Sequence, residues 1–187
     1  MKRFKNFIAV CMVLIVVFSI SQPALAGKAK KIKPNSSVSY PFPVPLKNLA
    51  NYTSLKKKQT DTEFQQAYNV ALEIVTPLKD LSRQKQLIGI ARALRYLFEI
   101  GEVRYSTSAP HYNDPYGYFV TGVASCAGCT RATGLCLNIL GIPYEHVNEN
   151  KWDHQWCRVN VNGTYWICDA FGLCCEPEPA PYKHPKF

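Results

Sequence analysis

Residues 154–170 read HQWCRVNVNGTYWICDA, two alternating runs on either side of Asn162-Gly163. Asn-Gly at such a place is the strongest short-range signal of a β-hairpin with a two-residue turn. This turn fixes the register of the two strands and places Trp156 opposite Asp169. His154 lies two residues before Trp156, so it becomes the diagonal neighbour of Asp169 at about 7 to 8 Å between backbones. We therefore expect an antiparallel pair that presents an imidazole beside a carboxylate.

A helix is predicted from Cys126 to Leu140, because apolar residues recur there at helical spacing and a glycine and a proline soon follow. Cys126 is its first residue. A helix N-terminus and a nearby imidazolium together lower the pKa of a cysteine thiol from about 8.5 to roughly 3.5–7.5. We therefore expect Cys126 to be a nucleophile, His154 its base and Asp169 the group that orients the histidine.

Three blocks around these residues resemble the transglutaminase-like superfamily of papain-type thiol enzymes. Residues 122–143 are similar to its cysteine block, a C-x-G helix start that ends in L-G-I-P. His154-Gln155-Trp156 resembles the H-A-W strand of that family, and Trp166-Ile167-Cys168-Asp169 resembles its W-x-x-D strand. The resemblance covers roughly residues 62–172. The chain departs from the family pattern at positions that line or flank the cleft, namely Cys129, Gln155 and Ala170-Phe171.

The resemblance implies an α+β fold with a papain-like core, in which N-terminal helices and the cysteine-bearing helix pack against an antiparallel sheet. It also implies a Cys126, His154 and Asp169 triad and acyl transfer through a thioester. No cofactor or metal is expected. The Cys126 backbone N–H at the helix start would hold part of the oxyanion. Tyr116 or Tyr118 is a candidate second donor, and packing over the cleft is the alternative role for both.

Two further helices are predicted before the cysteine block. Apolar residues follow helical spacing from Thr62 until Pro77 ends the run. Ser82 is a suitable N-cap for a second helix, which Gly101 ends. A short extended piece, Val103–Tyr105, then leads into a turn-rich segment.

The first 60 residues differ in composition from the rest. Residues 1–26 contain three basic residues, an apolar run and a terminal Ala-Leu-Ala, the layout of a secretory signal peptide. A retained membrane anchor is the alternative. Residues 27–60 are interpreted as a disordered, Pro-containing basic linker, and residues 61–187 as the transglutaminase-like domain. The protein is therefore expected to be secreted, extracellular or associated with the cell envelope, without a stable membrane span after signal removal.

The net charge of +9 is unevenly distributed. Residues 1–26 contribute +3, residues 27–60 contribute +8 from eight lysines, and residues 61–187 contribute −2. Attraction of the basic arm to an anionic cell-envelope surface is one interpretation, and a solvated linker is the other. Nucleic acid is not an expected partner, because no recognisable binding module surrounds the lysines.

Six cysteines remain once the signal-peptide Cys11 and the nucleophile Cys126 are set aside: 129, 136, 157, 168, 174 and 175. The hairpin register places Cys157 opposite Cys168 within disulfide range, while the helical cysteines are equally suited to be buried thiols. A redox dithiol or half of a zinc site at residues 126–129 is disfavoured, because the chain lacks a second C-x-x-C. Histidines 111, 146 and 184 have no comparable partners and are expected on the surface or in loops.

These features predict an exported thiol acyltransferase or hydrolase whose partner is a protein or peptide substrate bearing a reactive amide. The alternative is a non-catalytic cell-envelope-binding module that retains the same fold. The triad does not distinguish cross-linking, deamidation and cleavage, because these reactions differ in the acceptor that reaches the thioester.

Overall fold

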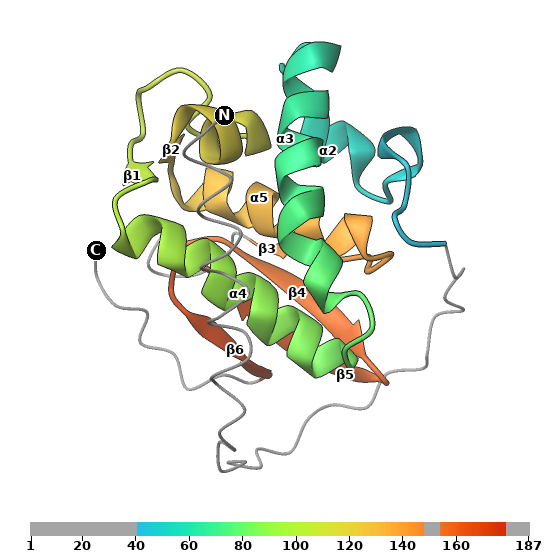
Figure 1. Ribbon diagram of the computed structural model, residues 1–187. Coiled ribbons are helices and arrows are strands. Elements are labelled where there is room, and N and C mark those ends of the chain that lie inside the picture. Colours follow the sequence, from blue (N-terminus) through green and yellow to red (C-terminus); the bar gives the residue numbers. More distant parts are fainter. Residues whose placement is uncertain (1–40, 148–153, 179–187) are drawn as a thin grey trace.

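The computed structural model describes residues 41–147 and 154–178, which combine helices with an antiparallel sheet (Figure 1). The predicted α+β class is confirmed. In chain order the elements are η1 (Leu46–Asn48), α2 (Tyr52–Lys56), α3 (Asp61–Val75), η2 (Thr76–Leu78), α4 (Arg83–Glu99), β1 (Arg104–Tyr105), η3 (Gly117–Thr121), β2 (Val123–Ala124), α5 (Cys126–Ile139), β3 (Glu145–Val147), β4 (Trp156–Val161), β5 (Thr164–Asp169) and β6 (Cys174–Pro177).

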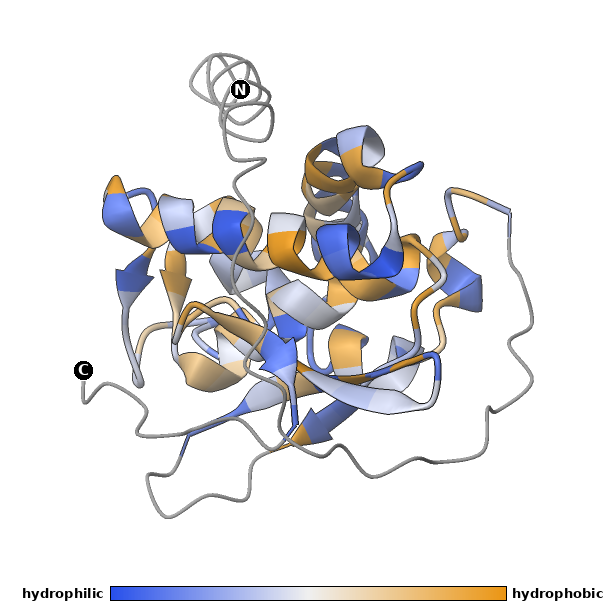
Figure 2. Ribbon diagram, turned by 90° about the horizontal axis from the view of Figure 1, so that it is seen from below, coloured by the Kyte–Doolittle hydropathy of each residue, from blue (hydrophilic) through white to orange (hydrophobic). Residues whose placement is uncertain are grey.

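The three long helices lie within about two residues of their predicted bounds. Thr60 caps α3: its hydroxyl accepts a hydrogen bond from the Glu63 N–H at 3.2 Å, and the Glu63 carboxylate accepts one from the Thr60 N–H at 2.7 Å. α4 follows Ser82 and ends before Gly101, which has a left-handed φ of 77°. Hydrophobic and hydrophilic segments alternate along the helices in Figure 2, as expected of helices that bury one face.

The sheet has the order β3-β4-β5-β6 and is antiparallel throughout. The predicted hairpin register is confirmed, since Cys157 pairs with Cys168 and Val161 with Thr164. Asn162 and Gly163 have φ values of 52° and 82°, the left-handed conformation that a two-residue hairpin turn requires. The sequence pattern did not predict β3 and β6, which add one strand on each side of the hairpin.

α4 and α5 pack against the sheet, and α3 packs against α5 (Figure 1). The Cys157 thiol donates a hydrogen bond to the Thr130 carbonyl in α5 at 3.2 Å, and the Cys168 thiol donates one to the Leu87 carbonyl in α4 at 3.6 Å. Both side chains therefore point toward the helices. Both are free thiols, so the register brings them opposite each other without a disulfide.

The prediction of a disordered linker up to residue 60 is wrong for residues 41–60. Val44, Leu49 and Leu55 in this segment are buried in the same core as the long helices. The Val44 N–H donates to the Ile139 carbonyl at 3.1 Å, and the Tyr68 hydroxyl donates to the Val44 carbonyl at 2.8 Å. The ordered domain therefore includes residues that the charge pattern assigned to a linker.

Shortening Leu55 to alanine is expected to lower the free energy of unfolding by about 2–5 kcal/mol, because the fully buried side chain would leave a cavity in the core. Urea unfolding measures this loss. Lys58→Ala, at an exposed position nearby, is the control and should change stability by less than about 0.5 kcal/mol. Equal stability of the Leu55→Ala and wild-type proteins would show that the segment does not contribute to the core.

Residues 1–40 lie outside the described part of the chain, so the predicted signal peptide and the first part of the linker are not described here. In residues 41–147 and 154–178, none of the helices has the length and apolar character needed to cross a membrane.

Candidate active site

Cys126 is the first residue of α5, and backbone packing fixes its position. Ser125 is the N-cap of the helix, and its hydroxyl accepts a hydrogen bond from the Gly128 N–H at 3.4 Å. The Ser125 N–H donates to the Tyr112 carbonyl at 2.7 Å. A Cβ atom at Gly128 would lie 2.4 Å from that carbonyl oxygen, so only glycine lets the loop approach the helix this closely. The glycine of the C-x-G motif thus has a steric role.

His154 and Asp169 form a buried pair, with 5% and 2% of their surfaces exposed. His154 Nε2 lies 2.8 Å from Asp169 Oδ2, and Asp169 Oδ1 accepts hydrogen bonds from the N–H groups of Phe171 and Gly172, both at 3.0 Å. Because Nε2 is engaged by Asp169, Nδ1 is the ring nitrogen left for the hydrogen bond between His154 and the Cys126 side chain. The structure therefore brings together the three residues predicted from sequence.

The pKa of His154 is raised to about 9. Burial alone would lower it, because desolvation penalises the charged ring. Hydrogen bonds to Asp169 and to the Cys126 side chain, together with the charges of these two groups, outweigh burial. At neutral pH the ring is therefore an imidazolium held next to the sulfur.

A cleft of about 690 Å³ opens at Cys126. Its lining comes from α2 and the turn after it, the segment from β1 to α5, and the neighbourhood of β3 and β4. The lining residues are Ser54, Lys57, Tyr105, Thr107, Tyr112, Asn113, Ser125, Cys126, Ala127, Arg131, His146 and Gln155. Since Cys126 is half-buried in this wall, a substrate carbonyl in the cleft can reach the sulfur, with the buried histidine next to it.

Neither Tyr116 nor Tyr118 is among the residues that line this cleft. Tyr118 is buried in the core, where its hydroxyl donates to the Leu94 carbonyl at 2.5 Å. Tyr105 and Tyr112, which the sequence pattern did not single out, line the cleft instead. Burial and the nearby charge of Cys126 raise the pKa of Tyr105, so its hydroxyl stays protonated at neutral pH. Tyr105 and Tyr112 are therefore better placed than Tyr116 and Tyr118 to act as a second oxyanion donor.

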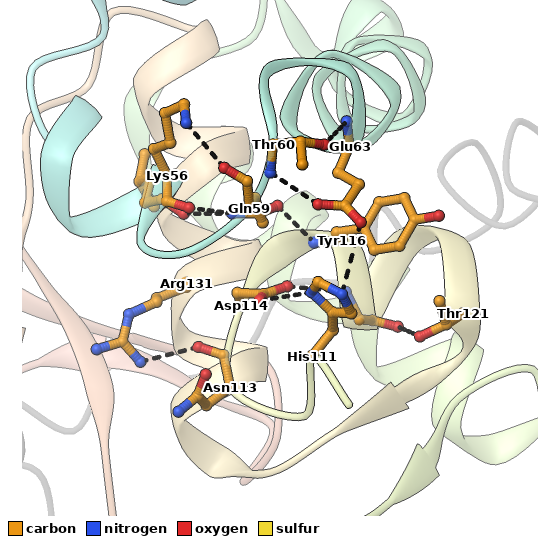
Figure 3. Close-up of polar contacts among 12 residues, drawn as sticks. Lys56, Gln59, Thr60, Glu63, His111, Asn113, Asp114, Tyr116, Thr121 and Arg131 are labelled. Atoms are coloured by element: carbon orange, nitrogen blue, oxygen red, sulfur yellow. Dashed lines mark hydrogen bonds and ion pairs between the residues drawn. The ribbon is translucent and has the colours of Figure 1, made fainter. Parts of the chain in front are cut away.

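A polar network ties the loop before the cysteine to the segment before α3 (Figure 3). The buried Gln59 side chain donates to the carbonyls of Leu55 and Lys56, both at 2.8 Å, and accepts from the Tyr116 N–H at 3.0 Å. These bonds connect the start of the domain to the loop that precedes Cys126.

Two histidines differ from the sequence prediction. His111 Nδ1 lies 2.9 Å from Asp114 Oδ2, and its Nε2 lies 3.6 Å from Glu63 Oε1 (Figure 3). His146 Nε2 lies 2.7 Å from Gln155 Oε1, and both residues line the cleft. The expectation that these histidines lack comparable partners is wrong, because packing brings Glu63 to His111 and Gln155 to His146. His111 does lie in a loop, as expected, whereas His146 lies in β3. The third, at position 184, lies outside the described residues.

Cys129 is buried beneath the helix start. Burial, followed by the charges of Asp169 and Cys126, raises the pKa of its thiol well above the usual value. A thiol that resists ionisation is poorly suited to redox exchange or metal binding. Within residues 41–147 and 154–178, no cluster of three or more His, Cys, Asp or Glu side chains could hold a metal ion.

Comparison with known proteins adds no assignment for this site. No protein-family model matches the sequence, and no curated protein matches it at a significant level of similarity. The transglutaminase-like resemblance therefore stays a prediction, based on three short sequence blocks.

Proposed function

We propose that this protein is an exported thiol acyltransferase or hydrolase that acts on protein or peptide amides. The observation that carries the proposal is the buried His154–Asp169 pair, whose histidine is also hydrogen-bonded to Cys126 at the start of α5. A helix start, an imidazolium and a carboxylate around one sulfur are the parts that thiol acyl transfer requires. A transglutaminase-like fold with a papain-like core and export by the N-terminal segment belong to the same proposal, supported by the sequence blocks and the signal-peptide pattern.

In the first half-reaction, the Cys126 sulfur attacks the amide carbonyl carbon and forms a C–S bond. The resulting oxyanion accepts a hydrogen bond from the Cys126 N–H, in the helical turn whose N–H groups have no carbonyl partner within the helix. Collapse of the tetrahedral intermediate breaks the C–N bond, and His154 gives its proton to the departing ammonia or amine. A thioester and a neutral imidazole remain.

In the second half-reaction, water or an amine attacks the thioester carbon. His154 takes the proton of this acceptor, the C–S bond breaks, and the thiolate leaves with the electron pair. The product is an acid when water attacks and a new amide when an amine attacks. The imidazolium and the sulfur are then ready for another turnover.

Selective alkylation tests the proposal. At neutral pH, iodoacetamide is expected to modify Cys126 at least about tenfold faster than Cys175, which is also half-buried but lies in β6. The buried cysteines should react still more slowly. Mass spectrometry of digested protein, sampled over time, gives each rate. Uniform rates for Cys126 and Cys175 would favour the non-catalytic binding module instead.

Turnover of a glutamine peptide then identifies the reaction. Mass spectrometry, with and without an added primary amine, distinguishes deamidation, amine incorporation and peptide cleavage. Prior alkylation of Cys126 should abolish whichever product forms. Product formation that survives complete alkylation of Cys126 would exclude this cysteine as the nucleophile.

A further inference from the structure

One side of the cleft carries fixed positive charge. Lys57 and Arg131, here called the basic wall, both line it, and no Asp or Glu is among the described lining residues. His146, beside them, is held neutral at pH 7, because burial and the charges of Arg131 and Lys57 lower its pKa in spite of a hydrogen bond to Gln155. The side chains that line the cleft therefore offer cations and neutral groups to a substrate.

Lys57 is positioned by the backbone. It is the C-cap of α2, with a φ of 45°, and its N–H donates to the Thr53 carbonyl at 3.2 Å. The preceding Lys56 pairs with the Asp61 carboxylate at 3.1 Å. Among the ion pairs of the described residues, none involves the Lys57 ammonium. This ammonium is therefore available to a ligand in the cleft.

Arg131 has its guanidinium held in place by neutral groups. It donates hydrogen bonds to the carbonyls of Ser54 at 3.2 Å, Asn113 at 3.1 Å and Ala127 at 3.3 Å, of which Figure 3 shows the Asn113 contact. Carbonyl groups orient the cation without neutralising it. The carboxylate of Asp114 lies outside the lining, and its charge acts on both Lys57 and Arg131. It is engaged by His111 (Figure 3) and accepts a hydrogen bond from the Gly117 N–H.

We propose that the basic wall binds a carboxylate of the acyl donor, so that the preferred substrates are peptides with glutamate or aspartate beside the reactive amide. This inference rests on the proposed function, because it assumes that the cleft holds the acyl donor of Cys126. Opposite charges at the rim of a site mainly set selectivity and the rate of association. The basic wall would thus act as a specificity determinant separate from the triad.

Peptide binding tests the basic wall without turnover. Isothermal titration calorimetry on the Cys126→Ser protein compares three end-blocked tripeptides, each with a central glutamine flanked by two glutamates, two glutamines or two lysines. At low salt the glutamate peptide is expected to bind about two- to fivefold more tightly than the glutamine peptide, and the lysine peptide most weakly. The difference should shrink at about 1 M salt, where charges are screened within about 3 Å.

Two lysine variants in the same Cys126→Ser background localise the effect. Lys57→Gln is expected to bring the ratio of glutamate-peptide to glutamine-peptide affinity close to one. Lys58→Gln removes the same charge from the adjacent exposed residue, which does not line the cleft, and should preserve the ratio. Equal affinities for the two peptides in the parent protein, or equal losses in both variants, would overturn the subsite.

The experiments can reject the acyl-transfer function and the basic wall independently of each other. Selective alkylation of Cys126 without any charge preference among the peptides overturns the basic wall and leaves the acyl-transfer function standing. A preference for the glutamate peptide that depends on Lys57, together with an unreactive Cys126, supports the basic wall as a binding site and overturns the acyl-transfer function.

Discussion

Replacing Cys126 with serine is expected to lower kcat/KM for a glutamine peptide by about 10⁴- to 10⁶-fold. Serine keeps the shape of the side chain, but its hydroxyl ionises far less readily than a thiol, so the first half-reaction loses its nucleophile. Initial rates of ammonia release, measured at several peptide concentrations, give kcat/KM for the variant and the wild type.

Cys175→Ser is the matched control for this substitution. Cys175 is half-buried like Cys126, but it pairs with Cys168 in the sheet and does not line the cleft. Its replacement should leave kcat/KM within about twofold, and both variants should unfold within about 1 kcal/mol of the wild type. If Cys126→Ser kept a tenth of the wild-type activity, the thioester mechanism would be untenable.

The hairpin, the contact between His154 and Asp169, and the start of α5 could be predicted because local sequence determines them. Asn162-Gly163 favours one turn type, and that turn sets every pair of opposite residues in β4 and β5. His154 and Asp169 then meet as diagonal neighbours, and their contact at 2.8 Å agrees with this register. The start of α5 is also determined by nearby residues. Ser125 caps the helix, and Gly128 lets the Tyr112 carbonyl approach it closely.

Residues 41–60 could not be assigned from sequence. Their buried apolar residues, Val44, Leu49 and Leu55, follow neither a helical nor a strand period, and lysines and prolines surround them. Long-range bonds hold the segment in place, such as the bond from the Asn51 N–H to the Asn138 side chain at 2.7 Å. No local sequence pattern predicts a hydrogen bond between residues so far apart in the chain. The lysines and prolines of the segment therefore suggested a linker.

The outer strands and the basic wall were missed for a related reason. β3 has three residues and β6 four, too few to show alternation, and their place in the sheet depends on the hairpin beside them. Lys57 directly follows α2 and Arg131 lies in α5, and only the packing of these helices brings their charges to one cleft. Tertiary contacts, rather than the periodicity of the sequence, therefore determine which charges line the cleft.

Asp169→Asn is expected to lower kcat/KM by about 10³- to 10⁴-fold, although it changes one atom of the side chain. In the wild type, Oδ1 accepts two backbone N–H groups and Oδ2 faces His154 Nε2. An asparagine must keep its oxygen toward the two N–H donors, so its NH₂ group faces Nε2. Nε2 must then accept, which leaves the proton on Nδ1 and fixes the tautomer that cannot take a proton from the sulfur side.

Asp169→Ala distinguishes the effect of a wrong His154 tautomer from the effect of losing the hydrogen bond that holds the ring. Alanine removes the hydrogen bond to His154 and leaves the ring free to adopt either tautomer. It also leaves the buried Phe171 N–H and the partly buried Gly172 N–H without their acceptor, so it should be the less stable variant by about 1–3 kcal/mol. We expect Asp169→Asn to be at least as inactive as Asp169→Ala while being more stable. An asparagine variant with near-wild-type kcat/KM would exclude Asp169 as the group that orients His154.

The pH dependence provides an independent test of the same pair. Because the folded pKa of His154 is raised from 6.5 to about 9, its protonation stabilises the fold fully below pH 6.5, and this contribution is lost as pH rises through about 9. Wild-type kcat/KM should also fall through about pH 9, where His154 can no longer protonate the leaving amine. Losing the carboxylate removes a main cause of the raised pKa, so in Asp169→Asn this fall should move to lower pH.

Urea unfolding at several pH values measures the corresponding change in stability. The stability advantage of the wild type over Asp169→Asn should be largest below pH 6.5 and should shrink above about pH 9, where the wild-type ring is neutral. Glu63 lies outside the pair and serves as a control position. In Glu63→Gln, the loss of stability as pH rises through about 9 should be the same as in the wild type. The range from about pH 6 to about pH 10 spans both the ordinary histidine pKa of 6.5 and the raised pKa of about 9. A stability difference that stays constant over this range would mean that Asp169 does not hold the His154 proton.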